Sequence, residues 1–303
     1  DSPGRRTSTL VRTRRMSSPS GAVCPAVSAS VCSSRSLLHF AKVKRMSLKE
    51  LDEKWAKSSE RTDIVVSFTT IPERINRIEQ TVKSLLYQKR LPKKIYLNIP
   101  YKSYRDGTEY AIPDWLENLN ALEIIRPEVD YGPSTKFIPT LENQMDGQLI
   151  LVVDDDHLYP HNFIKEFEQA HQKNNDVILA ASGWRAPKDL IDKSTTLWNN
   201  IFKIPPAPVK GTKIRKLYKT DIIQGYAGYL IKPEFFNLKE LKDYSEAPKE
   251  LRYVDDVWIS AHALVPKYIF PIKRYCYNPF FTRRFFKSTS LAKISNKGGK
   301  TDS

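Results

Sequence analysis

One stretch, LILVVDDDHLYP at residues 149–160, constrains the fold more than any other part of the chain. Five consecutive apolar residues lead directly into three aspartates. An apolar run of this length, bounded by polar residues, is typical of a strand buried on both faces of a parallel sheet. Such a strand cannot continue through three carboxylates, so the chain is expected to reach the surface at Asp154.

The three aspartates also predict a ligand. Carboxylates gathered at one strand end repel each other, and a divalent cation relieves that repulsion. Oxygen ligands favour Mg²⁺ or Mn²⁺, which commonly share their coordination with substrate phosphates. Open α/β sheets bind ligands just beyond the carboxyl ends of their strands. The stretch therefore predicts a metal and phosphate site, the alternative being a solvated acidic turn.

The flanking sequence predicts the rest of the fold. IVVSFTT, which begins at Ile64, and KIYLNI, which begins at Lys94, are strand-like because of their β-branched and aromatic residues. Helix-like segments with apolar stripes alternate with the strands. This alternation predicts an α/β domain with a mostly parallel central sheet flanked by helices. Residues 182–220 lose this regularity and contain Trp184 and Trp198, which favours a structured excursion facing a substrate.

The charge of the chain does not indicate a nucleic-acid partner. The formal net charge is +15, but residues 1–45 carry +8 of it and residues 281–303 carry +5, which leaves +2 for residues 46–280. The basic character therefore belongs to the ends of the chain and says little about the ligand of the fold. We predict a disordered basic tail over 1–46, a single domain over 47–280 and a second basic tail over 281–303.

The remaining composition bears on the compartment. Residues 1–45 are either a transit-like peptide or sequence upstream of the native protein, since Met46 opens a more ordinary stretch. Three cysteines without paired spacing argue against a disulfide framework or a structural zinc site. No apolar run approaches the length of a membrane-spanning helix. We expect a cytoplasmic protein, or an organellar one if the leader is a genuine transit peptide.

The segment YGPSTKFIPTLENQMDGQLILVVDDDHLYP, residues 131–160, resembles the nucleotide-sugar glycosyltransferases of the GT-A fold, especially the family-2-like group. That group has a turn glycine and a basic helix residue before a strand that ends in Asp-x-Asp, and a proline after it. Gly132, Lys136, the aspartate triplet and Pro160 occupy these places, with Lys136 standing where the family often has arginine. The resemblance implies a metal-dependent transferase that uses a nucleoside-diphosphate sugar as donor and a hydroxyl group of a glycan or other molecule as acceptor.

The same resemblance implies roles for the acids and the basic residue. Asp154 would contact the donor and help bind Mn²⁺ or Mg²⁺, Asp156 would bind that metal, and Asp155 could serve either purpose. Lys136 would contact the nucleotide or its phosphates. The alternative for Lys136 is an exposed helix lysine with no ligand.

The resemblance also implies roles for a loop segment, SFTTIPERI, for a glycine-containing segment, GYAGY, and for a third segment, YVDDVWIS. In SFTTIPERI, Thr70, Pro72 and Arg74 would lie near the base or ribose of the donor. In GYAGY, Gly225 and Gly228 would border the donor sugar and the acceptor, although glycines in a strand also mark packing bulges.

The segment YVDDVWIS contains an acidic pair, Asp255 and Asp256, that resembles the family's acidic pair at a helix start. Asp256 aligns with the catalytic base of inverting enzymes, and Asp255 with its neighbour. The alternative is helix capping, because aspartate is favoured at the start of a helix.

Other functions remain open at this stage. A nucleotidyltransferase also uses paired carboxylates and a metal, but it normally opens with a glycine-rich loop, and SFTTIPERI has no glycine. A phosphatase of the haloacid-dehalogenase type needs its nucleophilic aspartate on the first strand, whereas this triplet lies in the middle of the chain. A catalytically inactive sugar-binding or nucleotide-binding paralogue is the alternative that is not an enzyme, and the acids at both the metal and base positions argue against it.

Overall fold

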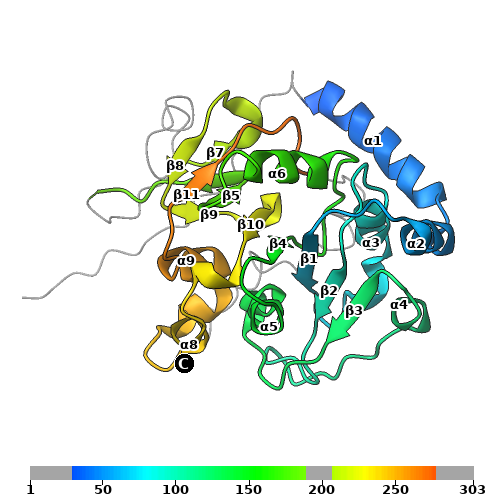
Figure 1. The fold of residues 1–303 in the computed structure, drawn as a ribbon. Helices are drawn as coiled ribbons and strands as arrows, with labels where there is room; N and C mark the ends of the chain where they lie inside the picture. Colours follow the sequence, from blue (N-terminus) through cyan, green and yellow to red (C-terminus); the bar gives the residue numbers. More distant parts are fainter. Residues whose placement is uncertain (1–28, 189–206, 278–303) are drawn as a thin grey trace, which may run out of the picture.

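The computed structural model describes residues 29–188 and 207–277. Their central feature is an eight-stranded sheet with the order β3-β2-β1-β4-β10-β5-β11-β8 (Figure 1). Its strands are β1 (Ile64–Thr69), β2 (Ile95–Asn98), β3 (Leu122–Ile125), β4 (Leu149–Val152), β5 (Ile178–Ala180), β8 (Tyr218–Thr220), β10 (Tyr229–Ile231) and β11 (Lys267–Ile269).

Most strand pairs in this sheet are parallel. β1 pairs in parallel with β2 and β4, β2 with β3, and β5 with β11. β10 is inserted antiparallel between β4 and β5, and β8 is antiparallel to β11 at the edge. The fold class predicted from the sequence, a mostly parallel sheet flanked by helices in one domain, is confirmed.

A small second sheet is formed by strands that neighbour β5 and β8 in the sequence. It joins β7 (Val209–Lys210), β6 (Ser182–Trp184) and β9 (Ile222–Ile223), all antiparallel. The predicted excursion over 182–220 therefore contains short strands in its described part, and residues 189–206 of it lie outside the described residues.

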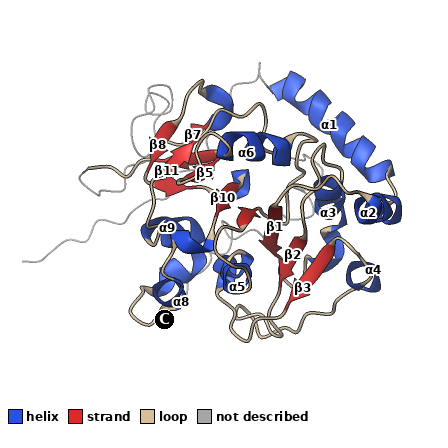
Figure 2. Cartoon of the chain, viewed as in Figure 1, coloured by secondary structure: helices blue, strands red, loops and turns tan. Residues whose placement is uncertain are grey.

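Helices cover both faces of the central sheet (Figure 2). The α-helices are α1 (Ala29–Arg45), α2 (Leu48–Lys57), α3 (Glu79–Leu86), α4 (Asp114–Glu117), α5 (Ile138–Glu142), α6 (Phe163–His171), α8 (Leu238–Lys242) and α9 (Asp255–Ala261). Short 3₁₀ helices lie in the segments between the main elements: η1 (Ile75–Arg77), η2 (Gly132–Lys136), η3 (Gly211–Lys213), η4 (Gly225–Ala227), η5 (Pro233–Phe235) and η6 (Lys249–Tyr253).

The apolar core has two halves, one on each face of the sheet. Successive side chains of a strand point to opposite faces. Ile64, Val66 and Phe68 of β1 accordingly pack in a cluster that includes apolar residues of α3 and α6, whereas Val65 packs with residues of α5, α8 and α9. β4 divides its side chains between the same two clusters. Burial on both faces explains why the sequence of β4 is an unbroken apolar run before Asp154.

The prediction of a disordered tail over residues 1–46 does not hold for residues 29–45, which form α1. Figure 1 shows α1 along the outer edge of the domain, beside α3. Val43 is fully buried, and the His39 ring stacks on Tyr277 with 4.2 Å between ring centroids. The Ser-rich and Arg-rich composition concealed these contacts, because a few apolar and aromatic residues are enough to dock one helix. Residues 1–28 and 278–303 lie outside the described residues.

Within the described part of the chain, none of the helices is both long enough and apolar enough to cross a membrane.

The packing of α1 leads to a stability prediction. Val43→Ala should lower the free energy of unfolding by about 2 kcal/mol, because two buried methyl groups leave a cavity. Leu38, on the same helix, is 70% exposed, so Leu38→Ala should change the stability by less than about 0.5 kcal/mol. Urea denaturation of the full chain measures both values. Equal and negligible effects would show that α1 does not pack on the domain.

Candidate active site

The three aspartates after β4 point in different directions. Asp155 is buried and faces the β1 loop: the Thr70 hydroxyl donates to its Oδ2 at 2.6 Å, and Arg74 Nη1 donates to its Oδ1 at 3.0 Å. Burial raises the pKa of Asp155 to about 6, although the Arg74 guanidinium opposes this shift. Asp155 therefore joins the acidic loop to the loop that follows β1.

Asp154 and Asp156 converge with His157 instead. One ligand atom from each of these three residues lies within 4.8 Å of the other two. His157 Nδ1 is 2.6 Å from Asp156 Oδ1. Burial favours neutral forms of both side chains, but their mutual attraction outweighs it, so the pKa of His157 is raised and that of Asp156 is lowered. Two carboxylates and an imidazole form a donor set that divalent metal ions accept.

A single buried cation connects these acids to the start of α9. Lys136 Nζ lies 2.8 Å from Asp154 Oδ1 and 2.7 Å from Asp255 Oδ2, and only 6% of the Lys136 side chain is exposed. Burial alone would lower the pKa of Lys136, but the charges of Asp154 and Asp255 raise it well above its usual value. Lys136 is thus held in the charged form between two carboxylates from distant parts of the sequence.

Side chains of β1 and β2 hold the backbone at Lys136 by hydrogen bonds. The Ser67 hydroxyl donates to the Lys136 carbonyl at 2.5 Å, and Asn98 Nδ2 donates to the same carbonyl at 3.3 Å. Gly132 begins this turn with φ +61°, and a Cβ there would lie 2.6 Å from the Arg252 carbonyl oxygen. Both the left-handed backbone and the close contact explain why glycine occupies this position.

Asp256 is held by a different partner from Asp255. The Gly225 backbone N–H donates to Asp256 Oδ1 at 2.7 Å. A Cβ on Gly225 would lie 2.4 Å from Lys136 Nζ, so a glycine allows the lysine to approach the backbone. Burial, strengthened by the negative charge of Asp255, raises the pKa of Asp256 to about 8.

These groups border a cavity of about 310 Å³, a volume at the lower end of the range for small-molecule sites. Basic side chains face it together with the acids. Its walls come from the β1 loop, the loop after β2, the η2 turn, the acidic loop and the start of α9, and they include Thr70, Arg74, Tyr104, Arg105, Tyr110, Gly132, Lys136, Asp154, Asp155, Asp156, Arg252 and Asp255. The cavity therefore combines an acidic corner with cations suited to phosphate groups.

The structure brings most of the predicted site residues together at this cavity. Four of them do not line it: Pro72, Gly225, Gly228 and Asp256. A Cβ on Gly228 would lie 2.7 Å from the Phe163 ring, and its φ is +85°, so its role in the structure is one of packing and backbone conformation.

Sequence reasoning did not select several residues that the structure places at the site. His157 follows the acidic triplet directly, and that adjacency could have added it to the candidate metal ligands. Arg105 and Arg252 also line the cavity. They come from segments without regular sequence patterns, so no signal in the sequence indicated them.

No family model and no curated protein matches this chain at the sequence level. Solved structures with a similar arrangement include GalNAc-T7 with UDP, GalNAc and Mn²⁺ (TM-score 0.41, 14% identity), and S. aureus TarS residues 1–349 with UDP (0.42, 15%) and with UDP-GlcNAc (0.39, 16%). Each alignment covers 71% of this chain, and respectively 43%, 60% and 57% of the other chain. The chain thus spans about half the length of these structures. These similarities say nothing about the ligands of this chain.

Proposed function

We propose that the protein is a metal-dependent glycosyltransferase that moves a sugar from a nucleoside-diphosphate donor to a hydroxyl group of an acceptor. One observation carries the proposal: Asp154, Asp156 and His157 converge at the end of β4, beside a cavity that Arg74 and Lys136 also line. A leaving nucleoside diphosphate needs its negative charge stabilised, and this combination of a metal site and cations supplies that stabilisation.

The donor set indicates which metal the site would hold. Asp154, Asp156 and His157 offer two carboxylate oxygens and an imidazole nitrogen. A set of oxygens alone would suit Mg²⁺ as well as Mn²⁺, whereas an imidazole favours the softer transition metal. We therefore favour Mn²⁺ over Mg²⁺. A metal bound there would stabilise the charge that develops on the leaving diphosphate.

The cations on the other side of the cavity suit the rest of the donor. Arg74 and Arg105 line the wall formed by the loops after β1 and β2, and Arg252 lines the cavity from η6. Arginine forms paired hydrogen bonds with phosphate oxygens. The Tyr104 ring is 58% exposed at this wall and lies under the Arg252 guanidinium, at 5.5 Å. An exposed aromatic ring of this kind suits stacking with a nucleoside base.

The two aspartates at the start of α9 would have different roles. The Asp255 carboxylate is committed to an ion pair with the Lys136 ammonium. Asp256 has a raised pKa, and its Oδ1 is oriented by the Gly225 N–H. It also lies outside the donor cavity, where an acceptor hydroxyl would approach. We therefore propose Asp256 as the general base of an inverting reaction and Asp255 as the residue that positions Lys136.

The metal role predicts how nucleotide binding responds to chelation. In the full chain, a panel of UDP, GDP, ADP and CDP should show at least one ligand whose affinity requires Mn²⁺ and is lost in excess EDTA. Asp156→Ala and His157→Ala should each weaken that binding by roughly 10- to 100-fold, whereas Asp146→Ala, at an exposed turn, should leave it unchanged. Isothermal titration calorimetry measures all of these affinities. Equal affinity with Mn²⁺ and with EDTA would refute the metal role.

The base role predicts a separation of binding from turnover. Asp256→Asn should retain the affinity for the donor, because the metal and phosphate contacts lie elsewhere, but should lower the rate of transfer by roughly 10²- to 10⁴-fold. Since the pKa of Asp256 is raised to about 8, the wild-type rate should rise with pH towards that value as the carboxyl group loses its proton. The variant should show no such rise. Rates come from a transfer assay with saturating donor.

Asp255→Asn provides the matched comparison. It removes a charge from Lys136 and should weaken donor affinity more than Asp256→Asn does. A wild-type rate and pH profile in Asp256→Asn would exclude this residue as the base and favour a retaining mechanism or a base elsewhere.

A further inference from the structure

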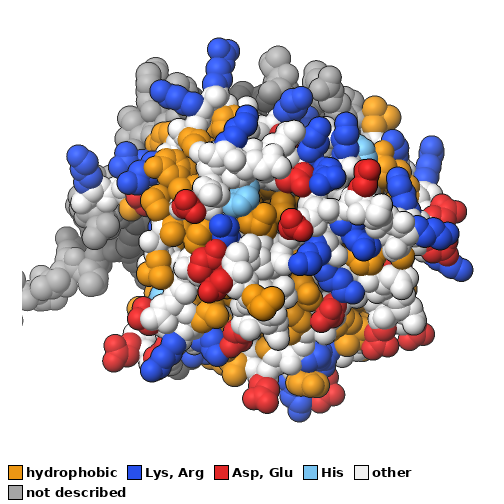
Figure 3. All heavy atoms as spheres, in the orientation of Figure 1, with side chains coloured by type: hydrophobic (Ala, Val, Ile, Leu, Met, Phe, Trp, Pro, Cys, Tyr) orange, Lys and Arg blue, Asp and Glu red, His pale blue; other side chains and the backbone are white. Residues whose placement is uncertain are grey.

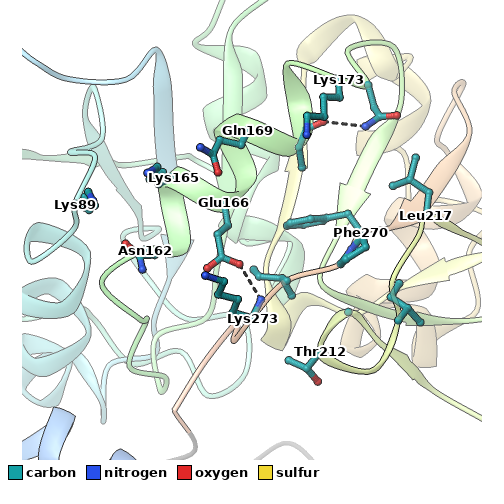
Figure 4. Close-up of a pocket in the computed structure, with 16 residues that line it drawn as sticks. Lys89, Asn162, Lys165, Glu166, Gln169, Lys173, Thr212, Leu217, Phe270 and Lys273 are labelled. Carbon is teal, nitrogen blue, oxygen red and sulfur yellow. Dashed lines mark hydrogen bonds between the residues drawn. The ribbon is translucent and has the colours of Figure 1, made fainter.

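A second and larger cavity, of about 750 Å³, lies on another part of the surface. It is bordered by α6, by the η3 turn and by the segment 270–273 that follows β11 (Figure 4). None of the residues that line it also lines the candidate active site. The groove is therefore spatially separate from the candidate active site.

The groove is strongly basic. Lys89, Lys165, Lys173 and Lys273 line it together with one acid, Glu166. Glu166 is already engaged, because its Oε2 accepts the Lys273 backbone N–H at 2.8 Å, a contact that Figure 4 shows between α6 and the strand-end segment. Among the described residues, no carboxylate lies within ion-pair distance of any of these four lysines.

The neighbouring segment extends the positive surface. Residues 207–219 contain five basic residues and no acid: Lys210, Lys213, Arg215, Lys216 and Lys219. Lys and Arg side chains gather along the upper edge of the molecule in Figure 3, whereas acidic side chains lie mostly below. Like charges that are left together without partners raise the local positive potential and attract an anionic ligand.

The other walls of the groove offer apolar and amide contacts in addition to charge. Ile214 and Leu217 give it an apolar side, and Leu217 is 37% exposed. Three amide side chains, Asn162, Gln169 and Asn174, face it from α6 and its ends. Amides bind hydroxyl groups, and apolar side chains pack on the carbon face of a sugar ring.

We propose that this groove binds an anionic oligosaccharide, with carboxylate or sulfate groups at the lysines and sugar hydroxyls at the amides. A concave groove does not fit a flat lipid surface. Nucleic-acid binding is less suited, because single strands stack their bases on exposed aromatic rings. Phe270, the one aromatic residue among those that line the groove, is only 2% exposed.

Binding of short oligosaccharides to the full chain tests the proposal. A heparin hexasaccharide presents sulfates and carboxylates, a galacturonate hexasaccharide presents carboxylates alone, and maltohexaose is neutral. At least one of the two anionic probes should bind, and maltohexaose should not. Lys165→Glu/Lys173→Glu should weaken that binding by roughly tenfold or more, because two attractive contacts become repulsive. Fluorescence titration at fixed ionic strength gives the affinities.

The matched control changes the net charge by the same amount as the groove variant, and it leaves the basic ends of the chain unaltered. Lys54→Glu/Lys239→Glu reverses two exposed lysines on α2 and α8, and it should bind the anionic probe as the wild type does. Lys165 lies in the first turn of α6, where a glutamate is favourable, so the groove variant should fold, as a thermal melt can verify.

Three results would overturn the proposal. The first is equal weakening in both double variants, and the second is no weakening in the folded groove variant. The third is duplex DNA binding more tightly than either anionic sugar, with the same loss in the groove variant, which would assign the groove to nucleic acid. A loss confined to the heparin probe would instead identify sulfate as the recognised group.

Discussion

The site depends on one buried cation. The Lys136 ammonium lies between Asp154, at the end of β4, and Asp255, at the start of α9, with almost no exposure to solvent. Removing one partner of such a buried group leaves the other charge uncompensated, which costs several kcal/mol. Lys136 therefore fixes the distance between the acids after β4 and the acidic pair of α9, which are about a hundred residues apart in the sequence.

The sheet makes this arrangement possible. β1, β2 and β4 are parallel neighbours, so their carboxyl ends meet at one edge. Ser67 and Asn98 hold the Lys136 carbonyl from that edge, and Asp155 turns inward to Thr70 and Arg74. Because Asp155 is occupied in this way, Asp154 and Asp156 remain available to converge with His157. The division of roles among three adjacent aspartates thus follows from the partners that each one meets.

Much of the fold and part of the site could be predicted from the sequence, because their signals are local. The apolar run before Asp154 indicates a buried strand, and three acids in succession indicate a ligand. Other features depend on contacts between distant segments and leave no local pattern. The docking of α1 through His39 and Val43 is one example, and the position of Arg252 in the cavity is another. The sequence also could not separate the environments of Asp255 and Asp256, since these depend on Lys136 and Gly225.

The central claim, that a metal ion and a nucleotide diphosphate meet at the end of β4, can be tested directly by pulsed electron paramagnetic resonance of bound Mn²⁺. With the tightest-binding nucleoside diphosphate present, the spectrum should contain two couplings: one to a ¹⁴N nucleus from His157, and one to ³¹P from the diphosphate. His157→Ala should remove the nitrogen coupling and leave any remaining phosphorus coupling in place. A spectrum of hydrated Mn²⁺ with neither coupling, from a folded protein with nucleotide present, would contradict the account.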